Sequence, residues 1–226
     1  MWAQSRKAGP VRYRRIPDQT VQRLPSYLRA LHEAARQGQG RICSEELAQI
    51  LPATALQIRK DLSHFGCFGT PGRGYDVEKL IGRLNKILKL EETHLVALAG
   101  AGNLGTALLR YPGFARYGFR IAAVFDTDPK KIGKSRHGLT IEDLASLPTL
   151  RDRGIRLGML AVPSAAAQQV AEMFARAGVL GILNFTPCCL TLPKSVRVVA
   201  IDIAAVLAAL PYHLPVPRPV INTKEE

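Results

Sequence analysis

The chain has 226 residues, of which 47% are hydrophobic, 22% charged and 6% aromatic. This composition is typical of a soluble globular protein and excludes a chain that is disordered throughout. The length fits either two small domains or one large one, so the pattern along the chain must decide between them.

The chain is strongly basic, and its charge is concentrated near the N-terminus. The 31 Lys and Arg residues exceed the 18 Asp and Glu residues, which gives a formal net charge of +13. Residues 1–90 hold 16 of the basic residues and 7 of the acidic ones. Because basic side chains bind nucleic-acid phosphates by displacing counterions, this part is expected to bind a polyanion. A solvated basic face that favours solubility explains the charge equally well.

The four cysteines form neither a disulfide pattern nor a metal pattern. Cys43, Cys67, Cys188 and Cys189 include no CxxC pair and have no His at metal-ligand spacing, so no metal site is expected. The setting is expected to be reduced and cytoplasmic. The adjacent Cys188 and Cys189 are either a redox-sensitive pair or small buried thiols. Without an 18-residue apolar run or an export signal, no membrane association is expected.

The first residues of the chain predict an arm followed by helices. Residues 1–15 are basic and lack an apolar period, so they are expected to form a flexible arm. Apolar residues at helical spacing predict a first helix from Ile16 to near Gly38. Ser44 is expected to cap a second helix, because its side-chain oxygen can accept a bond from a free N–H group, and Pro52 ends that helix.

A third helix is predicted from Ala55 to Phe65, with Thr54 as its cap and Ile58, Leu62 and Phe65 on its buried stripe. Gly and Pro between aromatic residues then predict a hairpin wing. Together these elements predict a winged helix-turn-helix domain whose third helix can lie in the major groove of double-stranded DNA. The residues expected to contact that DNA are Ser44, Gln57, Arg59, Lys60, Ser63, His64, Arg73 and Tyr75.

The rest of the chain predicts an alternation of strands and helices. A helix over residues 77–90 is expected to link two domains. Beyond it, strands are predicted at 94–99, 120–125, 156–162, 180–185 and 196–200, and helices at 103–111, 142–147, 164–177 and 203–213. Such βα units predict an α/β fold with a doubly wound parallel sheet, the Rossmann architecture.

A glycine-rich turn follows the first of these strands, with the sequence Gly100-Ala101-Gly102-Asn103-Leu104-Gly105. The pattern GxGxxG between a buried strand and a helix is typical of dinucleotide binding. Asp126 ends the next strand, where a carboxylate holds ribose hydroxyls and repels a 2′-phosphate. NADH or NAD is therefore expected rather than NADP(H), although Lys130, Lys131 and Arg136 add positive charge nearby. A glycine turn that only packs a strand on a helix is the alternative.

The sequence favours a protein that binds the dinucleotide over one that turns it over. A dehydrogenase needs a proton donor or acceptor beside the nicotinamide. His94, His137 and His213 have no obvious pairing, and a basic winged helix stands in place of a substrate domain. Two alternatives stay open: an NAD-dependent oxidoreductase with a nucleic-acid anchor, and a regulator that responds to CoA, since CoA-binding domains share this architecture.

From Ile16 to Leu214 the sequence resembles the Rex family of redox-sensing transcriptional repressors. The segments that carry the resemblance are Ile16-Pro17, Arg23-Leu24-Pro25, QIRKDLSHFGCFGT, GAGNLGTALLRYPGF, FDTDPKKIG and GILNFTP. The resemblance implies a homodimer with a domain-swapped C-terminal helix. It also implies that the protein binds inverted-repeat operators, that NAD favours or permits this binding, and that NADH releases the repressor.

The resemblance also implies roles for single residues. Lys60 is expected at base edges and Arg59 at phosphates. The implied redox switch moves Asp202 between Tyr111 and Arg29. The residues expected to hold the dinucleotide are Gly100, Ala101, Gly102, Asn103, Leu104, Gly105, Asp126, Lys131 and Tyr111.

The wing departs from the family pattern, because Pro71 and Gly72 precede Arg73 where the family commonly has Arg or Lys before Gly. The basic group is displaced to Arg73. The expected organisation comprises a flexible basic arm at 1–15, a winged-helix domain at 16–76, a linker helix at 77–90, a Rossmann domain with the swapped helix at 91–214, and a tail at 215–226.

Overall fold

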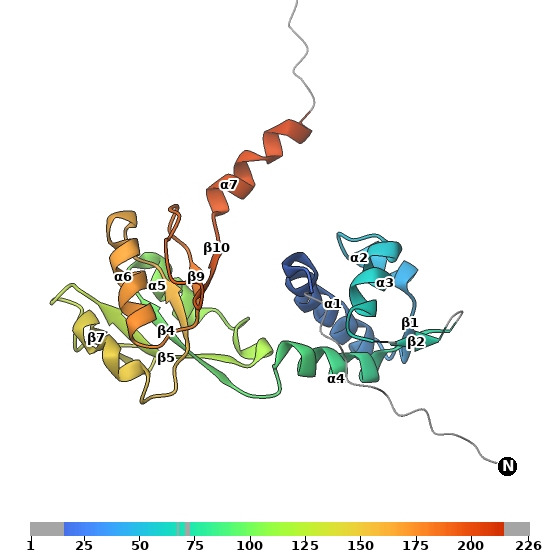
Figure 1. Ribbon diagram of the computed structural model, residues 1–226, viewed down its shortest axis with the longest axis horizontal. Coiled ribbons are helices and arrows are strands. Elements are labelled where there is room, and N and C mark those ends of the chain that lie inside the picture. The colour runs from blue at the N-terminus through green and yellow to red at the C-terminus, as the bar shows by residue number, and fades with distance from the viewer. Residues whose placement is uncertain (1–15, 67, 71–72, 215–226) are drawn as a thin grey trace, which may run out of the picture. The chain divides into compact units, whose positions relative to one another are not determined.

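The computed structural model describes residues 16–66, 68–70 and 73–214. The predicted arm at 1–15 and tail at 215–226 lie outside the described residues, as do Cys67, Pro71 and Gly72. The described residues form two compact units, one that extends to Glu92 and one that begins at Thr93 (Figure 1). Each unit is described by itself.

The first unit has the element order of a winged helix. Among its described residues, a three-stranded antiparallel sheet in the order β1-β3-β2 accompanies four helices. The elements are α1 (Asp18–Arg36), β1 (Arg41–Ile42), α2 (Ser44–Ile50), α3 (Ala55–Ser63), β2 (Gly69–Thr70), β3 (Gly74–Asp76) and α4 (Val77–Leu88). The predicted winged helix-turn-helix fold is confirmed.

Apolar side chains from α1, α2, α3 and α4 form the core of this unit, and α2 contributes the fully buried Leu47. Residues at helical spacing on α1, including Leu24 and Leu31, are buried, and α3 contributes Ile58 and Leu62. The residue Leu84 and its neighbours on α4 are buried as well, and α4 packs against α1. Burial of one face of each helix supplies the stabilisation that helices of seven to nine residues lack in isolation.

The prediction that Ser44 caps the second helix is wrong. Cys43 is the N-cap of α2, where its Sγ accepts a hydrogen bond from the Glu46 N–H, 3.4 Å away. The Glu46 carboxylate in turn accepts from the Cys43 N–H at 2.6 Å, which completes a capping box. A cysteine is an uncommon cap, so the sequence favoured the hydroxyl beside it. That hydroxyl accepts a bond from Arg59 instead.

The second unit is a seven-stranded sheet in the order β10-β9-β8-β4-β5-β7-β6. All neighbouring strands are parallel except β6, which pairs antiparallel with β7 at one edge. The strands are β4 (His94–Ala99), β5 (Phe119–Asp126), β6 (Ser135–Arg136), β7 (Leu139–Asp143), β8 (Leu157–Leu160), β9 (Gly181–Asn184) and β10 (Arg197–Ala200). The predicted doubly wound architecture is confirmed, with one antiparallel edge strand that was not predicted.

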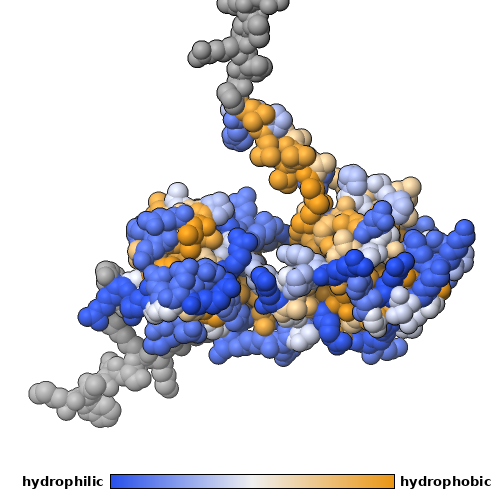
Figure 2. All heavy atoms as spheres, turned by 180° about the vertical axis from the view of Figure 1, so that it is seen from behind, coloured by the Kyte–Doolittle hydropathy of each residue, from blue (hydrophilic) through white to orange (hydrophobic). Residues whose placement is uncertain are grey.

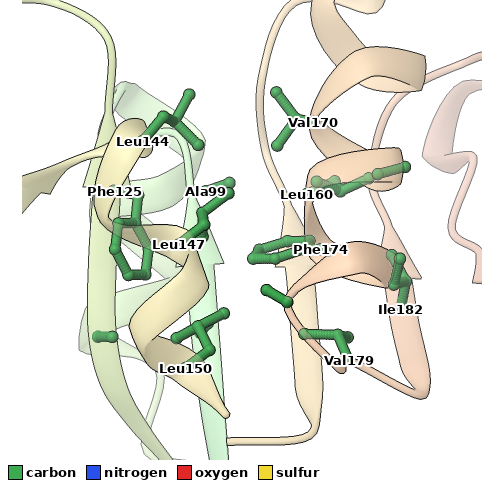
Figure 3. Close-up of a cluster of buried hydrophobic side chains, with 14 of the residues drawn as sticks. Ala99, Phe125, Leu144, Leu147, Leu150, Leu160, Val170, Phe174, Val179 and Ile182 are labelled. Carbon is green, nitrogen blue, oxygen red and sulfur yellow. The ribbon is translucent and has the colours of Figure 1, made fainter. Parts of the chain in front are cut away.

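Helices cover the sheet, and alternate residues of its strands enter two apolar clusters. Ala97 and Ala99 of β4 belong to one cluster (Figure 3), whereas Val96 and Leu98 belong to the other. Successive strand residues point to opposite faces, so both faces of the sheet are buried. The helices are α5 (Asn103–Arg110), η1 (Ala115–Tyr117), η2 (Leu144–Leu150), α6 (Ser164–Arg176), α7 (Ile203–Ala208) and η3 (Leu210–His213), where η denotes a 3-10 helix.

Two of the predicted helices differ from the structure. The segment predicted as a helix at 142–147 begins as the end of β7 and continues as η2. Asp143 ends the strand by accepting a hydrogen bond from the Ala145 N–H, and Pro148 lacks the N–H that an α-helix needs. The helix predicted at 203–213 is divided into α7 and η3, because Pro211 interrupts the α-helical hydrogen bonds.

The C-terminal helices carry an exposed apolar surface. Asp202 caps α7 by accepting a hydrogen bond from the Ala205 N–H at 2.9 Å. No described residue between Ile203 and Leu214 is buried. Figure 2 shows hydrophobic residues along this helix. The exposed large residues are Ile203, Val206, Leu207, Leu210, Tyr212 and Leu214.

Candidate dinucleotide-binding and DNA-binding sites

The glycine turn joins β4 to α5 and is set by backbone packing. Gly100 has a φ of +98°, and a Cβ atom there would lie 2.3 Å from the Ala161 carbonyl oxygen. A Cβ atom on Gly105 would lie 1.9 Å from the Gly100 carbonyl oxygen. A Cβ atom on Gly102 meets nothing within 4 Å. Backbone packing within the protein therefore requires glycine at 100 and 105, whereas Gly102 leaves open space in front of the turn.

That open space faces the N-terminus of α5. Gly102 is the N-cap of this helix, and no side chain caps it. The first N–H groups of the helix and its positive dipole end suit an anion such as a pyrophosphate. The turn therefore has the predicted strand, glycine and helix arrangement.

Asp126 lies at the end of β5 beside the glycine turn and is almost fully buried. Its carboxylate accepts hydrogen bonds from the Ala101 N–H at 2.8 Å, the Asp128 N–H at 2.9 Å and the Lys131 ammonium group at 2.9 Å. Burial raises the pKa of Asp126, but the bonds from Asp128, Lys131 and Ala101 outweigh it and lower the pKa below its ordinary value. Asp126 is therefore ionised at neutral pH, as a ribose ligand must be.

A cavity of about 720 Å³ connects the turn with this carboxylate. Five of the predicted cofactor residues line it, namely Gly100, Gly102, Leu104, Asp126 and Lys131. Ala101, Asn103 and Gly105 belong to the same turn without lining the cavity. Tyr111 is not among its lining residues; it is the C-cap of α5 and contacts Phe114 edge to face, with ring centroids 5.1 Å apart.

Several lining residues were missed by the sequence reasoning. They come from the ends of β8 and β9, the segment around η2, and α6, and they include Leu144, Ala161, Val162, Pro163, Gln169, Met173 and Phe185. Ligands of open α/β sheets bind outside the carboxyl ends of the strands. The ends of the predicted strands at 156–162 and 180–185 could have indicated these residues.

The described residues hold no group of three His, Cys, Asp or Glu side chains that could bind a metal ion.

Two of the histidines singled out in the sequence lie outside the cavity. The His94 ring contacts the Phe119 ring, and His137 accepts a hydrogen bond from Arg110 at 2.8 Å; neither histidine lines the cavity. The Cys188 thiol is half-buried and lies 3.0 Å from the Thr186 hydroxyl, whereas Cys189 is exposed. Within the described part of the chain, no helix is long and apolar enough to cross a membrane.

In the first unit, α3 separates its residues into a buried and an exposed face. Thr54 caps the helix as predicted, since its hydroxyl accepts from the Gln57 N–H at 3.2 Å. Ile58, Asp61 and Leu62 are buried. The exposed residues of the helix are Leu56, Arg59, Lys60 and Ser63, while Gln57 and His64 are half-buried.

A buried carboxylate fixes α3 on α1. Asp61 is fully buried and accepts bonds from two nitrogens of Arg23, at 2.6 and 2.8 Å, and from the Tyr27 hydroxyl at 2.7 Å. The Thr20 hydroxyl and the Gln57 amide also donate to it, at 3.0 and 2.8 Å. Burial raises the pKa of Asp61, yet these bonds outweigh it and hold the pKa well below its ordinary value. Sequence reasoning missed this network, because an Asp among basic helix residues resembles a solvated one.

The predicted phosphate contact, Arg59, is engaged within the protein. Its guanidinium donates to the Ser44 hydroxyl at 2.7 Å and to the Glu45 carboxylate at 2.6 Å. The backbone N–H of Glu45 and the Arg59 guanidinium lower the pKa of Glu45 to about 2. Both side chains are largely exposed, so this pair can open at small cost.

The wing lies beside these residues. Arg41 donates to the Arg73 carbonyl at 2.8 Å and to the Gly74 carbonyl at 3.2 Å. Arg73 is exposed, whereas Tyr75 is buried, so a direct contact between Tyr75 and DNA stays a prediction. The wing, α2 and α3 enclose a concavity of about 730 Å³, whose basic lining residues are Arg41, Arg59 and Arg73.

The predicted switch residues lie in different units. Arg29 is exposed on α1 of the first unit, while Tyr111 and the cap residue Asp202 belong to the second unit. The exchange of Asp202 between the other two side chains therefore stays a proposal.

Comparison with known protein families divides the chain in the same way. Residues 15–63 match a family described as the N-terminus of a putative DNA-binding protein. Residues 91–188 match a family described as a CoA binding domain.

Curated relatives cover most of the chain. A redox-sensing transcriptional repressor Rex from Chloroflexus aurantiacus is 44% identical over 199 residues, which are 88% of this chain and 94% of the relative. The Rex protein of Streptomyces coelicolor is 42% identical over 89% of this chain and 79% of its own length. A solved structure of RSP with beta-NAD+ and operator DNA has a TM-score of 0.82 and 35% identity, covering 88% of this chain and 92% of that one. RSP with beta-NADH gives a TM-score of 0.80 and 33% identity, covering 88% and 94%.

A winged helix followed by a Rossmann unit with an open glycine turn defines a DNA-binding regulator under the control of a ligand. The identity to the curated relatives places the chain within one family of such regulators. The chain belongs to the Rex family of redox-sensing transcriptional repressors, which confirms the predicted family and its regulatory function. The members are named as repressors, so the oxidoreductase alternative is set aside.

Proposed function

We propose that the protein is a homodimeric repressor that binds an inverted-repeat operator and is released when NADH occupies the second unit. One observation carries the proposal: the open glycine turn and the ionised Asp126 line a single cavity, in a chain that also carries a winged helix. The similar protein RSP has been solved in complex with beta-NAD+ and operator DNA, and in complex with beta-NADH.

The cavity suits a dinucleotide. The N–H groups at the start of α5 would bind the pyrophosphate at Gly102, and Asp126 would accept the ribose hydroxyls. Lys131, which already bonds to Asp126, would orient this carboxylate. A negative carboxylate at this place disfavours the 2′-phosphate of NADP(H) and the 3′-phosphate of CoA. The cofactor set proposed in full is Gly100, Ala101, Gly102, Asn103, Leu104, Gly105, Asp126, Lys131 and Tyr111.

The DNA face would combine base and phosphate contacts. Lys60 is exposed on α3 and would reach base edges in the major groove, while Arg59 would exchange Glu45 for a phosphate. Arg73 would place a positive charge from the wing on the backbone. Ser44, Gln57, Ser63, His64 and Tyr75 would support this face or contact the DNA beside it.

The exposed C-terminal helix supports the dimer. An apolar surface of this kind is rarely left in water and marks an interaction site. We assign a second copy of the chain as the partner, with α7 exchanged between subunits. The exchange would bring Asp202 to the surface of the other subunit. There Asp202 would contact either Tyr111 or Arg29, and a change from one contact to the other would reorient the winged helices.

The organisation proposed from the sequence is retained, with a DNA-binding domain at 16–76, a connecting helix at 77–90 and a dinucleotide domain at 91–214. A repressor acts on the chromosome, so the protein would work in the cytoplasm of its cell.

A titration tests the proposed function. An operator is first recovered by selection from random-sequence duplexes with the full-length protein, and its fluorescent form is then titrated at fixed salt. NADH is expected to weaken operator binding by roughly 5–150-fold. NAD is expected to permit binding, and CoA is expected to leave it unchanged. Operator affinity that is indifferent to NADH, or that responds to CoA alone, contradicts the proposal.

A further inference from the structure

One side chain on the DNA face does not fit the polar character of its surroundings. Leu56 is the second residue of α3, and 70% of its surface is exposed. A single exposed leucine is common in proteins. Its position makes this one unusual, because the first residues of a recognition helix are the ones that reach base edges.

The exposed stripe of α3 consists of Leu56, Arg59, Lys60 and Ser63, which lie three or four residues apart on one side of the helix. The opposite side holds the buried Ile58 and Leu62. Leu56 and Lys60 therefore face the same partner. Lys60 carries a positive charge, which favours DNA over an apolar protein surface as the partner that binds this face.

The polar neighbours of Leu56 are already engaged. The Gln57 amide is bonded to Asp61 at 2.8 Å, and Arg59 is bonded to Ser44 and Glu45. Gln57 can leave Asp61 only by removing a donor from a buried carboxylate, which is costly. At the N-terminal end of the stripe, the side chain free to meet a base is Leu56, and it has no hydrogen-bonding group.

We propose that Leu56 recognises a thymine in each operator half-site through the 5-methyl group of the base. The methyl group of thymine is the one apolar feature of the major-groove edges, and an aliphatic side chain can cover it. The proposal rests on the proposed operator binding and adds the residue and the base atom that carry part of its specificity.

The experiment removes one methyl group at a time. The inverted-repeat duplex recovered by selection is synthesised with deoxyuridine in place of each thymine in turn, which deletes only the 5-methyl group. For the full-length protein, replacing the thymines at one symmetric pair of positions by deoxyuridine is expected to weaken binding. The expected loss is about fourfold per half-site, which is the effect of one buried methyl group.

Variants identify the side chain that reads the methyl group. Leu56→Ala is expected to bind the thymine and uracil duplexes within about twofold of each other at that pair. Leu56→Met keeps an apolar side chain and is expected to retain the discrimination. Ile50→Ala is the matched control, because Ile50 is another exposed apolar residue, at the end of α2, and its loss is expected to leave the methyl effect unchanged.

The outcomes separate this assignment from the proposed function. If selection recovers an operator but no uracil substitution weakens binding, or if Leu56→Ala retains the full methyl effect, the role of Leu56 is wrong and operator binding stands. If the full-length protein selects no sequence at all, operator binding itself fails, and the role of Leu56 fails with it.

Discussion

The glycine turn and the DNA-reading helix are held in place by different physical means. Backbone contacts set the turn, since Gly100 and Gly105 lie against carbonyl oxygens that a Cβ atom would strike. Side-chain hydrogen bonds set the helix, because Asp61 gathers donors from both α1 and α3. The first site is therefore sensitive to added volume, and the second to lost polar groups.

The largest expected effect comes from adding one methyl group to the turn. Gly105→Ala forces a Cβ atom into the Gly100 carbonyl, so it is expected to lower the free energy of unfolding of the second unit by about 3 kcal/mol or more. Thermal unfolding measures the stability, and calorimetry with NADH measures the loss of binding. Gly102→Ala is the matched control: its Cβ atom has open space, so the unit is expected to stay folded while NADH binding weakens. Equal stability losses in both variants would contradict the packing argument.

The next effect concerns Asp61. Asp61→Ala leaves the Arg23 guanidinium without its carboxylate, and breaking a buried ion pair typically costs about 3–5 kcal/mol. The first unit is expected to lose this stability and its operator binding, while NADH binding by the second unit remains. Glu33→Gln serves as the control on α1, because its pair with Arg36 is exposed and is expected to contribute less than about 1 kcal/mol. Unchanged operator binding in the Asp61 variant would show that the network does not position α3.

The same carboxylate predicts a pH dependence. The pKa of Asp61 is lower in the folded protein than its ordinary value of 3.8, so its contribution to stability is complete above that value. The contribution is lost as the pH falls below about 3.8, toward the folded pKa. Denaturant unfolding between pH 2 and 5 is expected to show a weaker acid dependence in Asp61→Asn than in the unmodified protein. Identical pH slopes would contradict the assignment.

The smallest expected effect comes from breaking the ion pair between Arg59 and Glu45. Glu45→Gln removes the carboxylate that holds this guanidinium, so operator binding is expected to tighten by a few fold and to become more salt-dependent. Anisotropy titrations at several salt concentrations measure both quantities. Glu78→Gln is the control for a general loss of negative charge, since Glu78 is exposed on α4. If Glu45→Gln gives the same gain when Arg59 is also replaced by Gln, the pair does not restrain Arg59.

The two sites also differ in how far the sequence alone could predict them. The glycine turn and Asp126 follow local rules, in which a strand, a spacing and a backbone conformation act within about 30 residues. Asp61 and Cys43 depend on partners that only the fold brings close, as with Arg23, which is 38 positions away from Asp61. The β6-β7 hairpin was missed because β6, the edge strand, has only two residues, and the short strands on either side of Gly138 carry no clear periodicity. The apolar residue Leu56 was passed over because polar residues were expected on the DNA face.

The central claim is that the dinucleotide and the operator compete through the same protein. Thermodynamic linkage requires that the operator weaken NADH binding by the same factor by which NADH weakens operator binding. Calorimetric titration of NADH into the full-length protein, with and without saturating operator, measures this factor directly. The account predicts weaker NADH binding in the presence of operator, by roughly 5–150-fold. Equal NADH affinity in the two titrations would contradict it.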